Sequence, residues 1–205
     1  MNWRNEMRTG VNNRNNEADV MKSVEEATDR AVNAQVEKNL FLGEYKERII
    51  KALTFEEIKE KGIYYEIEKA LENKDAAKMV ISRHVDFNNI KKYIEIAKQK
   101  KIPYKMIDNL VSMGEIALVV VAKDAIIHEA GDEIIVTSKL EKCHLKHLPD
   151  VYYEAMESAV CNFHLNIIKN EMPEYAKNYK ELTFMDKLFG SKCPICQKLG
   201  GKKRG

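Results

Sequence analysis

The stretch that decides the fold is residues 76–122, AAKMVISRHVDFNNIKKYIEIAKQKKIPYKMIDNLVSMGEIALVVVA. It contains three apolar segments that are short enough to be buried strands, at residues 79–81, 103–107 and 116–122. The first two flank a segment with helical periodicity. This order predicts a β-α-β crossover with two parallel strands, followed by a further strand.

The crossover helix is expected over residues 87–101. Asp86 stands at the N-cap position, where a carboxylate accepts hydrogen bonds from the free N–H groups of the first turn. Pro103 cannot continue the helix. The buried face of the helix is predicted to consist of Ile90, Tyr93, Ile94 and Ala97. Residues 116–122 (IALVVVA) are apolar throughout, which predicts a central strand covered on both faces.

The segments that precede this stretch are less regular. Residues 1–16 are rich in Asn and Arg and offer little apolar surface, so we expect them to be disordered. Residues 18–39 carry a narrow helical stripe of small side chains. The apolar spacing of residues 45–53 suits a helix as well as a strand. Because the following TFEE has the spacing of a capping box, we favour a strand over residues 48–54 and a helix that starts at Thr54.

Three segments together resemble a known family. They are FLGEYKERIIKALTFEEI from Phe41, YYEIEKALE from Tyr64 and SRHVDFNNIKKYIEIAKQKKIPYKMID from Ser82. Over about residues 40–136 the chain resembles the YueI-like family of small cytoplasmic proteins from Gram-positive bacteria. The resemblance implies an α/β fold with a mixed sheet and flanking helices, similar to the Bacillus type of chorismate mutase and to ribosomal proteins that bind kink-turn RNA. That family has no assigned activity, so the resemblance supplies no catalytic residue.

A helical extension is expected after the sheet. Residues 126–127 and 134–136 flank the turn-forming AGDE and predict a closing hairpin. Pro149 and Asp150 open a predicted helix that continues through an apolar face to residue 169. The chain is thus expected to have a disordered start and light helix (1–39), an α/β domain (40–138), a helical C-terminal extension (139–190) and a basic tail (191–205).

Charge and composition exclude several functions. The chain has 34 basic and 32 acidic side chains, spread along the sequence, whereas a protein that binds bulk duplex DNA usually needs a concentrated basic surface. Neither a membrane-spanning run nor the apolar core of a signal peptide is visible. Four cysteines at irregular spacing do not make a disulfide framework. We therefore expect a cytoplasmic protein that contacts neither a membrane nor bulk duplex DNA.

The cysteines near the end of the chain are candidate metal ligands. Cys193 and Cys196 form a CPIC pair, which is half of a zinc site because two thiolates at this spacing can share a tetrahedral ion. Cys161 and His164, three residues apart on one helix face, would complete a Cys₃His set. The alternatives are the CPIC pair of a second chain or the KCHLKH residues Cys143, His144 and His147. A redox disulfide and idle thiols are further alternatives, and zinc is the one cofactor that the sequence indicates.

Polar side chains follow both predicted parallel strands. Arg83, His84 and Asp86 come after the first strand, and Asp108 and Asn109 come after the second. Ligands of open α/β sheets bind outside the carboxyl ends of the strands, and Arg83 beside a helix start favours an anion. These five residues are therefore a candidate ligand-binding site. The alternative is that Asp86 only caps the helix, while the others form a turn or are solvated.

No catalytic residue can be assigned, because the sequence shows no nucleophile beside a base. We favour a non-enzymatic binding or adaptor module for a small anion, a structured RNA or a partner protein; the alternative is a small enzyme or a thiol or metal protein that uses the CPIC pair. Kink-turn RNA binders carry Gly-x-Asn-Glu at a helix start, whereas the nearest segment here, LGEYK at residues 42–46, lacks the Asn. Structured RNA stays open because five lysines cluster on the crossover helix: Lys91, Lys92, Lys98, Lys100 and Lys101.

Overall fold

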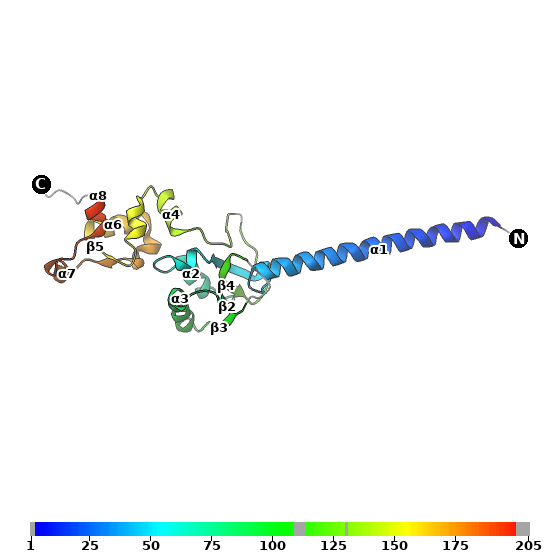
Figure 1. Ribbon diagram of the computed structural model, residues 1–205, viewed down its shortest axis with the longest axis horizontal. Helices are drawn as coiled ribbons and strands as arrows, with labels where there is room; N and C mark the ends of the chain where they lie inside the picture. The colour runs from blue at the N-terminus through cyan, green and yellow to red at the C-terminus, as the bar shows by residue number, and fades with distance from the viewer. Residues whose placement is uncertain (1–2, 109–113, 130, 200–205) are drawn as a thin grey trace.

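A four-stranded mixed sheet forms the centre of the structure (Figure 1). The computed structural model describes residues 3–108, 114–129 and 131–199, with side chains from Met21 onward. β2 and β3 are parallel, and β4 runs antiparallel to β1 and β2, so the predicted parallel crossover is confirmed. The strand assigned to residues 48–54 is also confirmed. In the order β1-β4-β2-β3, the strands are β1 (Ile49–Thr54), β4 (Ile116–Ala122), β2 (Ala76–Ser82) and β3 (Tyr104–Ile107).

The crossover helix is α3 (Phe87–Gln99), and its sequence explains its start, its end and its packing. Asp86 caps it as predicted, with its carboxylate accepting a 2.8 Å hydrogen bond from the Asn88 N–H. The backbone of Lys101 then takes a positive φ of 59°, two residues before Pro103. All four side chains of the predicted face are buried in the main core.

Replacing Ile94 by Ala is expected to lower the free energy of unfolding by about 2 to 5 kcal/mol, since a buried Ile site is emptied. Ile94 lies in the main core between α3 and the sheet. Equilibrium denaturation in urea measures the change. A loss below about 1 kcal/mol, the size of a surface effect, would contradict this packing.

The central strand β4 is covered on both faces, as its composition predicts. Val120 belongs to the core that lies under α2 (Tyr65–Glu72) and α3. Val119 belongs to a smaller core that also contains Phe41 and Leu42. Both valines are completely buried. Among the described residues, this second face is therefore covered by the turn that contains Phe41 and Leu42 and by Ile134.

The segment after β1 differs in part from the prediction. The capping box forms: Thr54 N–H donates to the Glu57 carboxylate at 3.0 Å, and the Glu57 N–H donates to the Thr54 hydroxyl at 3.4 Å. It opens only the short 3₁₀ helix η2 (Glu57–Lys59), and a similar turn, η1 (Lys46–Arg48), precedes β1. Gly62, at a φ of +71°, separates η2 from α2. The prediction that a regular helix starts at Thr54 is therefore wrong.

The predicted closing hairpin does not form within the described residues. The Ala52 N–H donates to the Ile134 carbonyl at 2.8 Å, and the Val136 N–H donates to the Ala52 carbonyl at 3.0 Å. Residues 134–136 thus lie along β1, with one parallel bridge at Ile135. The physical reason is that β1 is an edge strand, whose unpaired backbone groups accept another segment. Ala130, in the predicted turn, lies outside the described residues.

The start of the chain also differs from the prediction. The backbone is helical from Trp3 to Leu40 in α1, where we expected disorder up to residue 16. The sequence permits this helix because it has no proline before Pro103. The one glycine within the helix, Gly10, lowers helix stability by only about 1 kcal/mol. Figure 1 shows α1 projecting away from the sheet, and every side chain from Met21 to Val36 is exposed.

The C-terminal extension, residues 139–199, has its own core. Its side chains include Cys143, Tyr152, Leu165, Tyr175 and Ile195. Residues 191–199 are thus part of the extension, because Cys193 and Ile195 are buried in this core. The elements are α4 (Lys139–Leu145), α5 (Asp150–Glu154), β5 (Ala159–Val160), α6 (Asn162–Glu171), η3 (Pro173–Asn178), β6 (Lys180–Glu181), α7 (Phe184–Leu188) and α8 (Pro194–Leu199).

The single helix predicted from residue 150 to 169 is wrong, because the chain breaks between α5 and α6. Glu157 adopts a φ of +68° in the break. Its carboxylate accepts a 2.8 Å hydrogen bond from the Gly62 N–H, and its own N–H donates to the Asn178 carbonyl at 2.7 Å. These contacts with distant segments replace the helical hydrogen bonds. The short strands β5 and β6 then pair in parallel.

The extension docks on the loop of residues 60–64. The completely buried Lys139 ammonium donates to the Lys61 carbonyl at 2.8 Å and lies 3.6 Å from the centre of the Tyr64 ring. Asn178 bonds both backbone groups of Ile63, accepting at 3.1 Å and donating at 2.9 Å. Burial lowers the pKa of Lys139 to about 7, although Glu60 raises it. The two parts of the protein therefore share a buried polar junction.

Candidate metal centre

Four potential metal ligands converge at the end of the extension. Cys161 is the N-cap of α6 and His164 lies in the first turn of that helix, so one helix start presents both side chains. Cys193 immediately precedes α8, and Cys196 lies within it. The two predicted pairs are thus brought together, which the sequence spacing alone could not show.

The ligand atoms lie at the separations that a shared ion needs. The His164 Nδ1 atom is 3.3 Å from the Cys161 sulfur and 3.4 Å from the Cys196 sulfur. The Cys193 sulfur is 3.7 Å from the same nitrogen. The Cys161 and Cys196 sulfurs are 3.5 Å apart, and all four atoms lie within 4.8 Å of one another. Such a cluster can hold a metal ion.

The surroundings of the cluster favour the metal-binding forms of His164 and Cys193, whereas burial and the neighbouring thiols of Cys161 and Cys193 raise the pKa of Cys196 to about 12. Edge-to-face contacts with Tyr152 and Phe163 fix the His164 ring, and burial lowers its pKa, so the ring is neutral at pH 7. Burial raises the pKa of Cys193, but hydrogen bonds from backbone N–H groups of Cys161, Cys196 and Ile195 and from the Cys196 thiol lower it, and the net pKa of Cys193 is lowered. A neutral imidazole and a thiolate are the forms that bind metals.

The KCHLKH residues are not part of this cluster. The Cys143 sulfur is completely buried beside the Met172 sulfur, 3.7 Å away. The His144 Nε2 atom is 2.6 Å from the Asp150 carboxylate. His147 has a positive φ of 55° after α4. KCHLKH therefore supplies no ligand to the described Cys₃His set.

The residues predicted to bind a ligand after the parallel strands come together only in part. The His84 Nε2 atom lies 3.6 Å from the Asp108 carboxylate, and both side chains are largely exposed. Arg83 is exposed, and Asp86 is occupied as the cap of α3. Asn109 lies outside the described residues. The ligand site at this edge of the sheet stays a prediction.

Comparison with known proteins concerns the sheet domain and not the metal cluster. Residues 17–132, more than half of the chain, match the family described as "Protein of unknown function (DUF1694)". The chain belongs to the DUF1694 family. This match confirms the resemblance and extends it into α1, while the four metal-ligand candidates lie beyond its end.

A curated sequence and a crystal structure that are similar to this DUF1694 protein both carry the name YueI and come from Bacillus subtilis. The uncharacterized protein YueI of Bacillus subtilis (strain 168) is 28% identical over 93 residues, which cover 45% of this chain and 70% of the relative. A crystal structure of the YueI protein from Bacillus subtilis aligns with a TM-score of 0.47 and 25% identity, covering 50% of this chain and 78% of that one. These descriptions assign neither a ligand nor a reaction.

The described helices of the DUF1694 protein include none with the length and hydropathy needed to cross a lipid bilayer.

Sequence patterns missed a second group of interacting side chains in the DUF1694 protein. Lys142 forms an ion pair with Glu66, and the Tyr175 hydroxyl donates to the same carboxylate. Burial raises the pKa of Glu66, but Lys142 and Tyr175 lower it by a larger sum. These residues come from α4, α2 and η3, so no local spacing links them.

Proposed function

We propose that this DUF1694 protein is a non-enzymatic binding module whose C-terminal extension is stabilised by one zinc ion. Zinc–sulfur bonds of about 2.3 Å and zinc–nitrogen bonds of about 2.0 Å at tetrahedral angles place two sulfurs about 3.8 Å apart, and a sulfur and a nitrogen about 3.5 Å apart. The separations around the His164 nitrogen are 3.3, 3.4 and 3.7 Å. This agreement is the observation that carries the proposal.

The proposed zinc ion is structural because the protein would fill its coordination shell. Three sulfurs and one nitrogen complete a tetrahedron, whereas catalytic zinc sites keep one position for water or substrate. Cys193 and His164 are buried, and Cys161 and Cys196 are half-buried. The ion would therefore join α6 to α8 and close the core of the extension.

Metal analysis of the full-length protein tests this function. After production with zinc and purification without a chelator, plasma mass spectrometry is expected to find one zinc per chain. The double variant Cys193→Ser and Cys196→Ser is expected to retain none, because two of four ligands are lost. Cys143→Ala is the matched control, since this buried cysteine lies outside the cluster.

Two results would contradict the zinc site. One is a wild-type protein without zinc that contains a disulfide between Cys193 and Cys196. The other is a full complement of zinc in the double variant, which would place the ion elsewhere.

A further inference from the structure

The short helix α7 and the residue after it present large apolar side chains to solvent. These are Phe184, Met185, Leu188 and Phe189, which are between 55% and 80% exposed. With about 3.6 residues per turn, the four positions cover about 140° on one side of the helix, whereas Asp186 and Lys187 lie on the other side. An amphipathic helix of a globular protein usually turns its apolar side toward the core. In α7 no residue is buried, so this apolar side faces outward.

The position of α7 is fixed by its caps. The Asp186 N–H donates to the Thr183 hydroxyl at 3.2 Å, and the Thr183 N–H donates to the Asp186 carboxylate at 2.8 Å. Gly190, at a φ of +85°, ends the helix, and the Ser191 N–H donates to the Asp186 carbonyl at 2.9 Å. Figure 1 shows α7 at the outer end of the extension, away from the sheet. The apolar side chains are therefore held on a projecting, capped turn.

The chain after β6 is strongly basic. Residues 182–205 carry six basic side chains and one acidic side chain, whereas the rest of the chain carries 28 basic and 31 acidic ones. The one acidic residue, Asp186, is occupied in the cap of α7. Lys187 and Lys192 are exposed within and directly after the apolar turn. An apolar turn in a basic segment is complementary to a surface that is both apolar and negatively charged.

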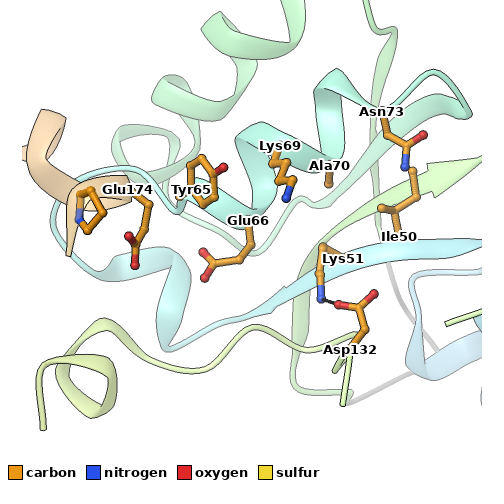
Figure 2. Close-up of a pocket in the computed structure, with 10 residues that line it drawn as sticks. Ile50, Lys51, Tyr65, Glu66, Lys69, Ala70, Asn73, Asp132 and Glu174 are labelled. Carbon is orange, nitrogen blue, oxygen red and sulfur yellow. Dashed lines mark hydrogen bonds and ion pairs between the residues drawn. The ribbon is translucent and has the colours of Figure 1, made fainter. Parts of the chain in front are cut away.

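The cavity of about 690 Å³ that Figure 2 shows has a different character. Two of the charged residues that line it are used within the protein, because Lys51 pairs with Asp132 and Glu66 pairs with Lys142. The apolar turn at α7 projects, so its partner has to surround the side chains instead of being enclosed by them.

We propose that α7 docks on the surface of a lipid bilayer that contains anionic phospholipids. Phe184, Leu188 and Phe189 enter the boundary between headgroups and acyl chains, while Lys187 and Lys192 lie at the level of the phosphates. Binding of this kind combines buried apolar area with electrostatic attraction to anionic lipids. The inference names the partner of the proposed binding module and rests on that part of the proposed function.

This inference replaces the expectation from the sequence that the protein contacts no membrane. That expectation was drawn from the absence of a spanning run and of a signal peptide, and docking on the surface requires neither.

Two other classes of partner fit the turn less well. Proteins that bind single-stranded nucleic acid stack the bases on aromatic rings, which Met185 and Leu188 lack. Five of the six basic residues after β6 are lysines, and lysine is depleted in protein–protein interfaces, where arginine is enriched.

Sedimentation with lipid vesicles tests the inference on the full-length protein whose zinc content has been measured. The probes are vesicles of phosphatidylcholine alone and vesicles with about 30% phosphatidylglycerol. We expect at least about tenfold tighter binding to the anionic vesicles, because each lysine near such a surface contributes about 1 kcal/mol. Salt at about 0.5 M is expected to remove most of this difference, since it screens exposed charges.

The apolar contribution is tested by the double variant Phe184→Ser and Phe189→Ser. Its affinity for the anionic vesicles is expected to fall at least about tenfold, since two exposed aromatic side chains no longer enter the bilayer. Leu145→Ser is the control, because Leu145 is 69% exposed in α4 of the same extension. This control is expected to bind as the wild type does, and unchanged circular dichroism and zinc content show that the variants are folded.

A second pair of variants separates the position of the charges from their number. Lys187→Gln with Lys192→Gln is expected to lower the affinity for anionic vesicles at least about tenfold, while the weak binding to neutral vesicles stays unchanged. Lys146→Gln with Lys169→Gln removes the same charge from other exposed positions of the extension and is expected to keep wild-type binding.

Several results would overturn the proposal. They are no binding to anionic vesicles, equal losses in the two lysine pairs, and full binding of the double serine variant. Binding of single-stranded polyuridine that depends on Phe184 and Phe189 would assign the turn to nucleic acid. A dimer in analytical ultracentrifugation that the double serine variant abolishes would assign it to a second copy of the chain. A zinc-containing protein that ignores vesicles contradicts this inference alone, whereas a zinc-free protein that passes these tests contradicts the zinc site alone.

Discussion

Removing zinc is expected to unfold the C-terminal extension while the four-stranded sheet stays folded. The core of the extension contains Cys193 and Ile195, which only the CPIC segment supplies. Structural zinc contributes about 10 to 16 kcal/mol of apparent binding free energy in small zinc domains, which is comparable to the whole stability of a domain. The sheet contains none of the proposed ligands, so its core does not depend on the ion.

Hydrogen exchange read by mass spectrometry measures this effect segment by segment. In the double variant Cys193→Ser and Cys196→Ser, or after treatment of the wild type with a strong chelator, amides of α6 and α8 are expected to exchange at least about a hundredfold faster, which corresponds to about 2.7 kcal/mol of local stability. Amides of β2 and β4 keep their protection. Cys143→Ala, the control, keeps the zinc and the protection of α6. Unchanged exchange in α6 and α8 would show that no ion stabilises the extension.

Replacing Gly62 by Ala is expected to lower the free energy of unfolding by about 3 to 6 kcal/mol. At a φ of +71° an L-residue costs about 1 to 2 kcal/mol. A Cβ atom at this position would also lie 2.6 Å from the Asn178 side chain. Asn178 must then move and lose its two half-buried hydrogen bonds to Ile63, each worth about 1 to 2 kcal/mol when its partner is left unsatisfied.

The variant Gly43→Ala separates the two contributions to this loss of stability, which are backbone strain and the displacement of Asn178. Gly43 has a similar φ of +81°, but no atom lies within 4 Å of a Cβ built there. We therefore expect this variant to lose only about 1 to 2 kcal/mol in the same urea titration, from backbone strain alone. Equal losses in the two variants would mean that Asn178 does not hold the extension against the loop of residues 60–64.

The sequence predicts the sheet because its signals are local. The apolar run of β4, the cap at Asp86 and the stop before Pro103 each depend on neighbours in the chain, and the structure contains all three. The predictions of the hairpin and of the long helix failed because contacts between distant segments decide the structure there. Residues 134–136 pair with the free edge of β1, and Glu157 breaks a helical pattern in order to reach Gly62.

Each of the two residue pairs of the candidate metal centre could be predicted from the sequence. Cys161 with His164 and Cys193 with Cys196 each have a spacing that metal sites use, but only the folded extension shows that the pairs meet. Lys139 illustrates what spacing cannot show. It stands in a charged segment, KLEKCHL, that resembles a solvated helix, yet its side chain is completely buried at the junction.

X-ray absorption at the zinc K-edge tests the central claim most directly. The account predicts a first shell of three sulfurs at about 2.3 Å and one nitrogen at about 2.0 Å in the wild-type protein. A first shell dominated by oxygen and nitrogen, or a protein that loses its zinc on dialysis against metal-free buffer, would contradict a buried Cys₃His centre at Cys161, His164, Cys193 and Cys196.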